Sequence, residues 1–159
     1  MPFERRGART DEYLEVMRTL WCDDVSEHHG EFYDLPACRM YPKPVQSPHP
    51  PIHVGGESKA AMRRVARSGQ GWYTFNRLPD DLPGPLAELE AALAAEGRTR
   101  ADIELTVSPY FNRVTPELIE GYRELGVDRV VALCLAFDVD SLRTGLDDLV
   151  TNALEPARG

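Results

Sequence analysis

The chain has 159 residues, with 18 lysines and arginines against 26 aspartates and glutamates, and a formal net charge of −8. This acidic balance, with no run of basic residues, argues against binding to nucleic acid or to an anionic membrane surface. No window approaches the ~20 consecutive apolar residues of a membrane span, and the charged N-terminus lacks the apolar stretch of a signal peptide, so we expect a cytoplasmic protein.

Residues 1–21 are predicted to form a helix. Leu14, Met17 and Trp21 recur on one face at helical spacing, and Asp11 and Glu12 suit the positive end of the helix dipole. No strand pattern precedes this helix in the sequence.

Residues 22–51 are predicted to form a proline-rich insertion. Within it, residues 31–35 are expected to form a short strand. Apolar side chains such as Phe32 and Met40 indicate that the segment packs against other residues and is not a solvated linker. The prolines that exclude a helix here are Pro36, Pro42, Pro44, Pro48, Pro50 and Pro51.

Residues 52–159 contain four predicted β-α units in succession. The expected strands are residues 52–54, 72–75, 103–107 and 130–135, and a helical pattern follows each of them. Ser58 is expected to cap the first helix, which Gly69 ends, and Thr115 is expected to cap the third. The last strand is an uninterrupted apolar run, which predicts that both of its faces are covered.

Alternating units of this kind predict a parallel sheet with right-handed crossovers, arranged as a barrel or as an open doubly wound sheet. The first strand leads into Gly55-Gly56-Glu57-Ser58, which is not the GxGxxG fingerprint of a dinucleotide-binding open sheet. We therefore favour an α/β fold of the (β/α)8 TIM-barrel type. A complete barrel has eight strands and about 250 residues, so we expect residues 1–159 to form a single partial domain, a half-barrel.

The turn after the first strand is the leading candidate for a binding site. Gly55 and Gly56 allow backbone N–H groups to approach a phosphate closely, and the dipole of the following helix favours an anion there. Ser58 either caps the helix or donates its hydroxyl group to a phosphate oxygen. The alternative is a tight turn with an ordinary serine cap. Glu57 complicates the phosphate hypothesis, because its carboxylate repels an anion unless it points away.

The end of the second strand is the second candidate. In a barrel the C-terminal ends of the strands form the active-site face, which here would include Trp72, Thr74, Phe75 and Asn76. Two of the four strand residues should simply fill the core. Thr74 and Asn76 share a parity and are the preferred polar contacts, and Arg77 is either a phosphate partner or a solvated charge.

Further polar residues are candidates of lower rank. Ser108, Tyr110 and Asn112 follow the third strand and are expected to line the same face, close to a substrate. His53, in a short strand, is expected to pack in the core and not to act as a base. No arrangement of a nucleophile with a base is visible, so no catalytic residue is assigned.

The histidine and cysteine patterns predict neither a metal site nor a disulfide. His28 and His29 are adjacent and therefore point in different directions, with no carboxylate or cysteine at ligand spacing. Cys22, Cys38 and Cys134 are odd in number and widely spaced, which is typical of reduced thiols in a cytoplasmic protein.

Several motifs, in order along the chain, resemble the luciferase-like monooxygenase superfamily. Residues 5–21 are similar to the helix before the insertion of that family. HGEFY at residues 29–33 and YPKPVQSP at residues 41–48 resemble the insertion. PPIHVGGES at residues 50–58 and GQGW at residues 69–72 resemble the next strand, turn, helix and strand. Residues 77–159 fit by the order of their elements.

This resemblance implies the C-terminal half of a barrel whose complete relatives move a hydride between a flavin or deazaflavin and an organic substrate. The PKPVQ and VGG motifs look most like the actinobacterial branch assigned to coenzyme F420, and FMN is the competing cofactor. The resemblance also implies a contact with the cofactor phosphate or ring around residues 74–76.

A half-barrel leaves two open sheet edges and an uncovered interior. We therefore expect a homo-oligomer or a complementary half-barrel as partner. The alternative to an incomplete enzyme is a non-catalytic module, derived from the same barrel, that binds a cofactor or mediates oligomerisation.

Overall fold

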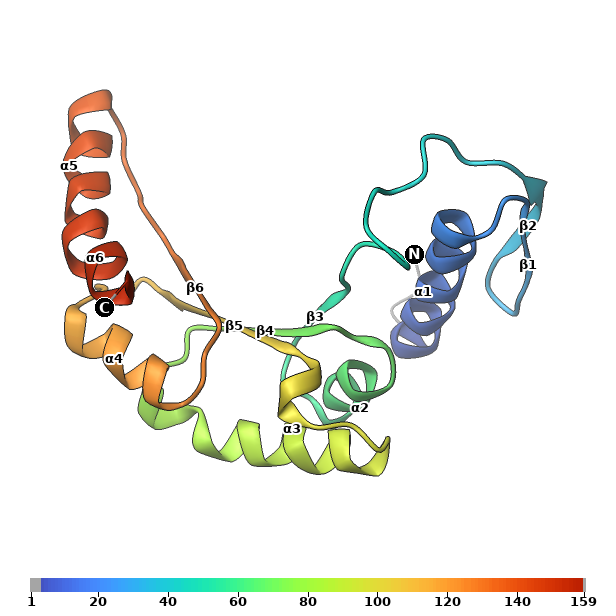
Figure 1. Ribbon diagram of the computed structural model, residues 1–159, viewed down its shortest axis with the longest axis horizontal. Helices are drawn as coiled ribbons and strands as arrows, with labels where there is room; N and C mark the ends of the chain where they lie inside the picture. Colours follow the sequence, from blue (N-terminus) through green and yellow to red (C-terminus); the bar gives the residue numbers. More distant parts are fainter. Residues whose placement is uncertain (1–3, 159) are drawn as a thin grey trace. The chain divides into compact units, whose positions relative to one another are not determined.

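The computed structural model describes residues 4–158, and the chain forms two compact units, Met1–Pro51 and Ile52–Gly159 (Figure 1). The boundary falls at the predicted end of the proline-rich segment. The first unit contains helix α1, Arg6–Cys22, and the second contains a four-stranded sheet with its helices.

In the first unit, α1 packs against an antiparallel hairpin of β1, Ser26–His29, and β2, Asp34–Cys38. The helix ends one residue later than predicted, and residues 1–3 of the predicted helix lie outside the described residues. The strand expected at residues 31–35 begins three residues later, at Asp34 in β2, since residues 30–33 connect β1 to β2. The amides of Phe32 and Tyr33 bind a carboxylate of α1 and do not pair with a neighbouring strand.

That carboxylate belongs to Glu12, which is almost fully buried. Glu12 accepts hydrogen bonds from the amides of Phe32 and Tyr33, at 3.0 and 2.7 Å, and lies 3.3 Å from Nε2 of His28. Burial raises the pKa of Glu12, but the amides of Phe32 and Tyr33 and the contact with His28 together hold this pKa below its ordinary value. The charged form of Glu12 therefore joins α1 to the hairpin.

The lowered pKa of Glu12 gives the first unit an acid-sensitive contact. A carboxylate whose pKa is lower in the folded state contributes stability above the unfolded-state pKa and loses that contribution as the pH falls through the folded pKa. Urea unfolding followed by circular dichroism should therefore show stability falling below about pH 5. Glu12→Gln should be less stable at pH 7 and show a shallower loss in acid. The exposed Glu15→Gln variant is the control, and equal pH profiles for both variants would contradict the assignment.

The second unit contains a parallel sheet in the order β3-β4-β5-β6. The strands are β3, His53–Gly55; β4, Gly71–Phe75; β5, Glu104–Tyr110; and β6, Arg129–Ala132. The helices are α2, Lys59–Ser68; α3, Pro83–Ala95; α4, Pro116–Glu124; α5, Val139–Leu149; and α6, Glu155–Arg158. Short 3-10 turns at Pro79–Asp81 and Arg100–Asp102 precede α3 and β5, and a π-turn at Val150–Leu154 joins α5 to α6. The predicted succession of β-α units is thus present.

One face of this sheet carries the core. In the register of β4 and β5, Trp72 pairs with Leu105 and Thr74 pairs with Val107, and all four side chains are buried. Helices α2, α3 and α4 lie along one side of the sheet (Figure 1). The buried helical residues are Ala61, Met62, Val65, Ala66, Leu86, Leu89, Leu93, Ile119 and Tyr122.

The opposite face is more polar. Residues of the other parity include Tyr73, which pairs with Thr106, and Arg129, which also pairs with Thr106. Arg129 forms a 2.9 Å ion pair with Glu104 along this face. The ring of His53 lies over Gly71, occupying the space that a Cβ atom at residue 71 would need. Only glycine at residue 71 is compatible with this position of the ring.

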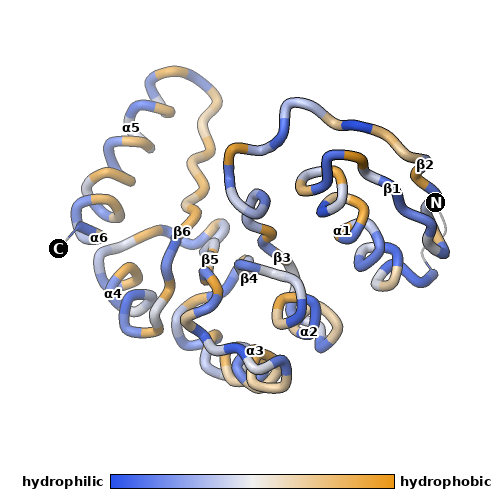
Figure 2. The backbone as a smooth tube through the Cα atoms, turned by 45° about the vertical axis from the view of Figure 1, so that its right-hand side comes forward, coloured by the Kyte–Doolittle hydropathy of each residue, from blue (hydrophilic) through white to orange (hydrophobic). Residues whose placement is uncertain are grey.

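The last predicted strand is shorter and more exposed than expected. β6 ends at Ala132, while Val131, Leu133 and Leu135 are each more than two-fifths exposed. The prediction of a strand covered on both faces is therefore wrong. β6 is the terminal strand in the order β3-β4-β5-β6, so only one of its edges is paired within the described residues. Figure 2 shows the hydrophobic run that continues from β6 towards α5.

The C-terminal helices pack against one another. α4 contacts both the π-turn and α6, and these contacts hold the C-terminal end of the second unit together. No helix within residues 4–158 combines the length and apolar character that crossing a bilayer requires.

The buried face of α3 is expected to dominate the stability of the second unit. Leu89 is fully buried, so Leu89→Ala should lower the free energy of unfolding by ~2–5 kcal/mol, through lost burial and the cavity left behind. The neighbouring exposed Glu90→Ala variant should change it by less than ~0.5 kcal/mol. Urea unfolding at pH 7 measures both, and a loss below ~1 kcal/mol for Leu89→Ala would contradict the packing described.

Candidate functional site

A depression of about 540 Å³ lies at the C-terminal ends of β3 and β4. We call it the β3–β4 depression. It collects residues from the β3–α2 turn and from the end of β4, which are adjacent parallel strands. Its lining residues are Gly55, Gly56, Glu57, Tyr73, Thr74, Phe75, Asn76 and Arg77.

The turn after β3 depends on its second glycine. Gly56 has a φ of 102°, a conformation that side chains with a Cβ atom rarely adopt. Its carbonyl oxygen accepts a 2.9 Å hydrogen bond from the indole Nε1 of Trp72, which is fully buried. A buried indole N–H needs a partner, so the core residue Trp72 fixes the orientation of the turn.

The turn leads directly into α2. The Ser58 hydroxyl oxygen accepts a 3.2 Å hydrogen bond from the amide of Ala61, as the predicted cap requires. The first-turn amides of Lys59 and Ala60 have no partner within the helix, because the first intrahelical bond runs from Met62 to the Ser58 carbonyl. These amides and the positive end of the helix dipole favour an anion beside the turn.

The Glu57 carboxylate is bound by residues at the end of β4. Arg77 engages both of its oxygens, from Nε at 2.9 Å to Oε1 and from Nη2 to Oε2, and the Thr74 hydroxyl donates to Oε1. The bond from Arg77 is the largest influence on the pKa of Glu57 and lowers it. Partial burial acts in the opposite direction, and the Thr74 hydroxyl lowers the pKa further. Glu57 is therefore held as a carboxylate.

The backbone around Arg77 is held by hydrogen bonds to two other elements. The preceding residue, Asn76, has a φ of 55°, and its amide donates a 2.7 Å hydrogen bond to the Ser108 carbonyl of β5. The carbonyl of Arg77 accepts a 2.5 Å hydrogen bond from the hydroxyl group of Tyr122 in α4. Burial raises the pKa of Tyr122 to about 12, so the hydroxyl group stays protonated as a donor.

The structure brings together Gly55, Gly56, Thr74, Phe75 and Asn76 of the predicted site residues, which all line the β3–β4 depression. Ser58 and Trp72 are not in this lining; Ser58 caps α2, and Trp72 supports the turn from the core.

Thr74 was predicted as a polar contact for a ligand, but its side chain is buried and already bonded within the protein. It shares the buried face with Trp72, and its hydroxyl group is already bound to Glu57. Tyr73 also lines the depression but was not predicted as a contact. The alternation of side chains along β4 is the signal that could have found it.

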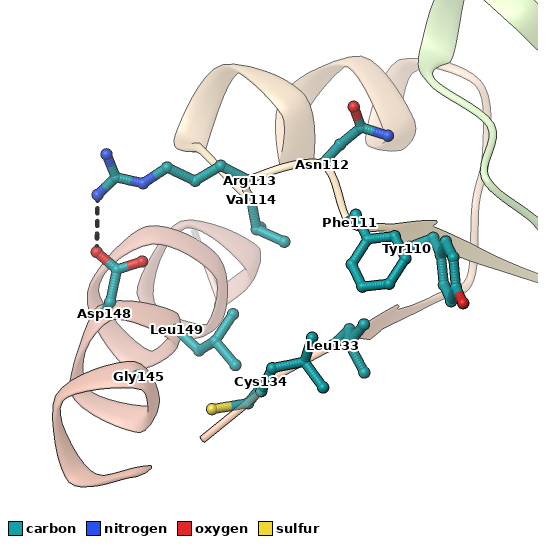
Figure 3. Close-up of a pocket in the computed structure, with 11 residues that line it drawn as sticks. Tyr110, Phe111, Asn112, Arg113, Val114, Leu133, Cys134, Gly145, Asp148 and Leu149 are labelled. Atoms are coloured by element: carbon teal, nitrogen blue, oxygen red, sulfur yellow. Dashed lines mark hydrogen bonds and ion pairs between the residues drawn. The ribbon is translucent and has the colours of Figure 1, made fainter. Parts of the chain in front are cut away.

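A second, smaller pocket of about 250 Å³ lies at the ends of β5 and β6, beside α5 (Figure 3). Tyr110 and Phe111 line one side of it, and an ion pair of 2.8 Å between Arg113 and Asp148 crosses its rim. Of the lower-ranked candidates, Tyr110 and Asn112 reach this pocket. Ser108 is buried within β5.

The two adjacent histidines of the hairpin, His28 and His29, make separate contacts. His28 lies against Glu12, whereas His29 lies 2.5 Å from Asp34 and 2.7 Å from Glu27. No group of three or more potential metal ligands with suitable geometry occurs within residues 4–158.

The parallel β-α units, with a glycine turn at the C-terminal ends of the strands, are the arrangement of a β/α-barrel protein. A family model described as luciferase-like monooxygenase matches residues 1–112. The chain therefore belongs to the luciferase-like monooxygenase family.

Two proteins of similar sequence are longer than this chain. An uncharacterized protein of Mycobacterium tuberculosis is 35% identical over 134 residues, which cover 82% of this chain and 45% of that protein. The FMNH2-dependent dimethylsulfone monooxygenase of Pseudomonas putida is 24% identical over 133 residues, covering 75% of this chain and 37% of that enzyme. The chain thus spans less than half the length of these relatives.

Solved structures show the same fold. The monooxygenase RslO1 from Streptomyces bottropensis matches with a TM-score of 0.77 and 16% identity, over 98% of this chain and 63% of that one. An F420-dependent secondary alcohol dehydrogenase in complex with an F420-acetone adduct matches with a TM-score of 0.61 and 17% identity, over 99% of this chain and 55% of that one. These matches support the prediction of a partial luciferase-like barrel.

The conformation of Gly56 predicts that alanine is tolerated much less well at this position than at Gly84. Gly56→Ala should lower the free energy of unfolding by about 1–2 kcal/mol, because a side chain at positive φ is strained. Gly84→Ala lies in α3, where φ is not positive and the new methyl group meets no atom within 4 Å beyond its chain neighbours and the helix backbone; because Pro85 follows and offsets the gain in helix propensity, the change should stay within about 0.5 kcal/mol. Thermal and urea unfolding measure both variants. Equal effects would mean that the turn does not require its positive φ.

Proposed function

We propose that this chain supplies the phosphate-binding side of a flavin- or deazaflavin-dependent oxidoreductase of the luciferase-like family. The observation that carries the proposal is the Gly55-Gly56 turn, whose positive-φ glycine leads directly into the first turn of α2. Membership of the family supports a hydride-transfer reaction with an organic substrate. When bound, the cofactor supplies the hydride donor or acceptor, and the residues described here anchor it.

The residues at the turn fit a phosphate group. The absence of a side chain at Gly55 and Gly56 leaves the backbone open, and the amides of residues 59 and 60 face no partner within α2. The β3–β4 depression, at about 540 Å³, falls within the ordinary size range of cofactor and ligand pockets. Phe75, which is exposed at the edge of the depression, supplies an apolar surface for a ring or its linker.

Coenzyme F420 is the first candidate cofactor and FMN the alternative. The PKPVQ and VGG motifs favour F420. The F420-dependent alcohol dehydrogenase of similar fold supports the same choice, whereas the FMNH2-dependent dimethylsulfone monooxygenase supports FMN. Both cofactors carry a phosphate, so the turn suits either.

A partner that completes the sheet is part of this proposal. β3 and β6 stand at the two ends of the sheet order, so each has one edge unpaired within the described residues. A second copy of the chain or a complementary barrel half would cover these edges. If the chain binds no cofactor, its role is instead that of a non-catalytic module for assembly.

Cofactor titration tests the proposal directly. Fluorescence titration with oxidised F420 and with FMN should give saturable binding of at least one of them, and FMN should bind more tightly than riboflavin, which lacks the phosphate. Gly56→Val should abolish this preference for phosphate by straining and filling the turn, whereas Gly84→Ala should retain it.

The mass of the protein in solution, recorded in the same buffer, tests the partner. A dimer or larger assembly supports closure by a second copy. Absence of binding to F420 and to FMN, in any oligomeric state, would reject the enzyme proposal and leave the assembly module.

A further inference from the structure

Glu57 occupies an unfavourable position for a phosphate-binding turn. It follows Gly56 and precedes the capping residue Ser58, so its backbone lies where an anion would approach α2. An unpaired carboxylate at this point would repel a phosphate across a short distance. The turn can bind a phosphate only if the charge of Glu57 is drawn aside and neutralised.

The end of β4 provides both effects. Arg77 binds the two carboxylate oxygens of Glu57 in a forked arrangement, which is the strongest geometry for a guanidinium–carboxylate pair. The buried Thr74 adds a hydroxyl donor to the same carboxylate. These three bonds tie the Glu57 side chain to β4 and satisfy its charge locally.

The position of Arg77 makes this arrangement specific and not a chance surface contact. Its backbone carbonyl is bound by the buried Tyr122, and the adjacent Asn76 is bound to β5 in a left-handed conformation. Two separate elements therefore fix the point from which the guanidinium group reaches Glu57. Lysine, which lacks the forked donors, could not reproduce both bonds.

We infer that Arg77 is a positioning residue for the anion site: it holds the Glu57 carboxylate away from the Gly55-Gly56 turn and so permits a phosphate group to bind there. This inference rests on the proposed function. It assigns the guanidinium group to Glu57, in contrast to an arginine that binds the phosphate itself.

The two roles of Arg77 predict opposite results for a double variant. If Arg77 acts through Glu57, then Arg77→Ala frees a negative charge beside the phosphate, and adding Glu57→Gln removes that charge and restores binding. If Arg77 binds the phosphate directly, Arg77→Ala weakens binding in the Glu57→Gln background as well, so the double variant binds more weakly than Glu57→Gln alone. A single substitution cannot separate these roles, because Glu57→Gln favours an anion in both.

The experiment measures the affinities of the whole chain for FMN and for riboflavin, which differ by the phosphate group alone. Arg77→Ala should weaken FMN binding by about tenfold or more and leave riboflavin binding unchanged. The loss should shrink at high salt, where charge repulsion is screened. Arg77→Ala with Glu57→Gln should bind FMN within about threefold of the affinity of Glu57→Gln alone. Arg113→Ala, which removes an arginine from another ion pair in the same unit, should retain wild-type affinity.

Each outcome decides between the possibilities. A double variant that binds FMN as tightly as Glu57→Gln alone supports the inference, with riboflavin binding as the control for correct folding. A double variant that binds FMN clearly more weakly than Glu57→Gln alone, or no selective loss of FMN in Arg77→Ala, overturns the inference and leaves the proposed function standing. A wild-type chain that does not distinguish FMN from riboflavin overturns both.

Discussion

The hydrogen bond from the indole N–H of Trp72 to the carbonyl oxygen of Gly56 joins the core of the second unit to its candidate site. Trp72 is fully buried and pairs with Leu105 across the sheet. The packing of helices against the sheet therefore determines where the turn carbonyl points, and with it the direction of the neighbouring amides. A turn fixed in this way costs little conformational entropy when a ligand binds.

Electrostatics adds a second constraint at the same place. The positive end of α2 attracts an anion, and Glu57 would counter that attraction if it were free. The ion pair with Arg77 neutralises this carboxylate, and Arg77 depends in turn on contacts from α4 and β5. Four elements of the barrel, α2, β4, β5 and α4, thus converge on one small region. This convergence is typical of sites at the C-terminal face of β-α barrels.

Local signals in the sequence predicted much of the second unit. The caps at Ser58 and Thr115 and the leucine face of α3 are all present, because each depends on residues within a few positions of one another. The glycine turn and the end of β4 were predicted as separate candidates, and they line one depression because adjacent parallel strands end at the same edge.

Features that depend on distant contacts were not predictable. The hairpin of the first unit is set by Glu12, twenty residues before the amide of Phe32 that it binds. The Glu57–Arg77 pair spans the same separation in sequence, so composition shows two charges and not their contact. The apolar run at residues 130–135 has the composition of a strand along its whole length, but only its first part, which belongs to β6, pairs with β5.

The contact between His53 and Gly71 has a consequence for how this sequence can vary. The imidazole ring fills the space of a Cβ atom at residue 71, so the two positions cannot change independently. In an alignment of homologues, residues larger than glycine at position 71 should accompany a small side chain at position 53. Such covariation would arise at the end of the strands opposite the glycine turn, and would reflect steric exclusion between β3 and β4 without any part in ligand binding.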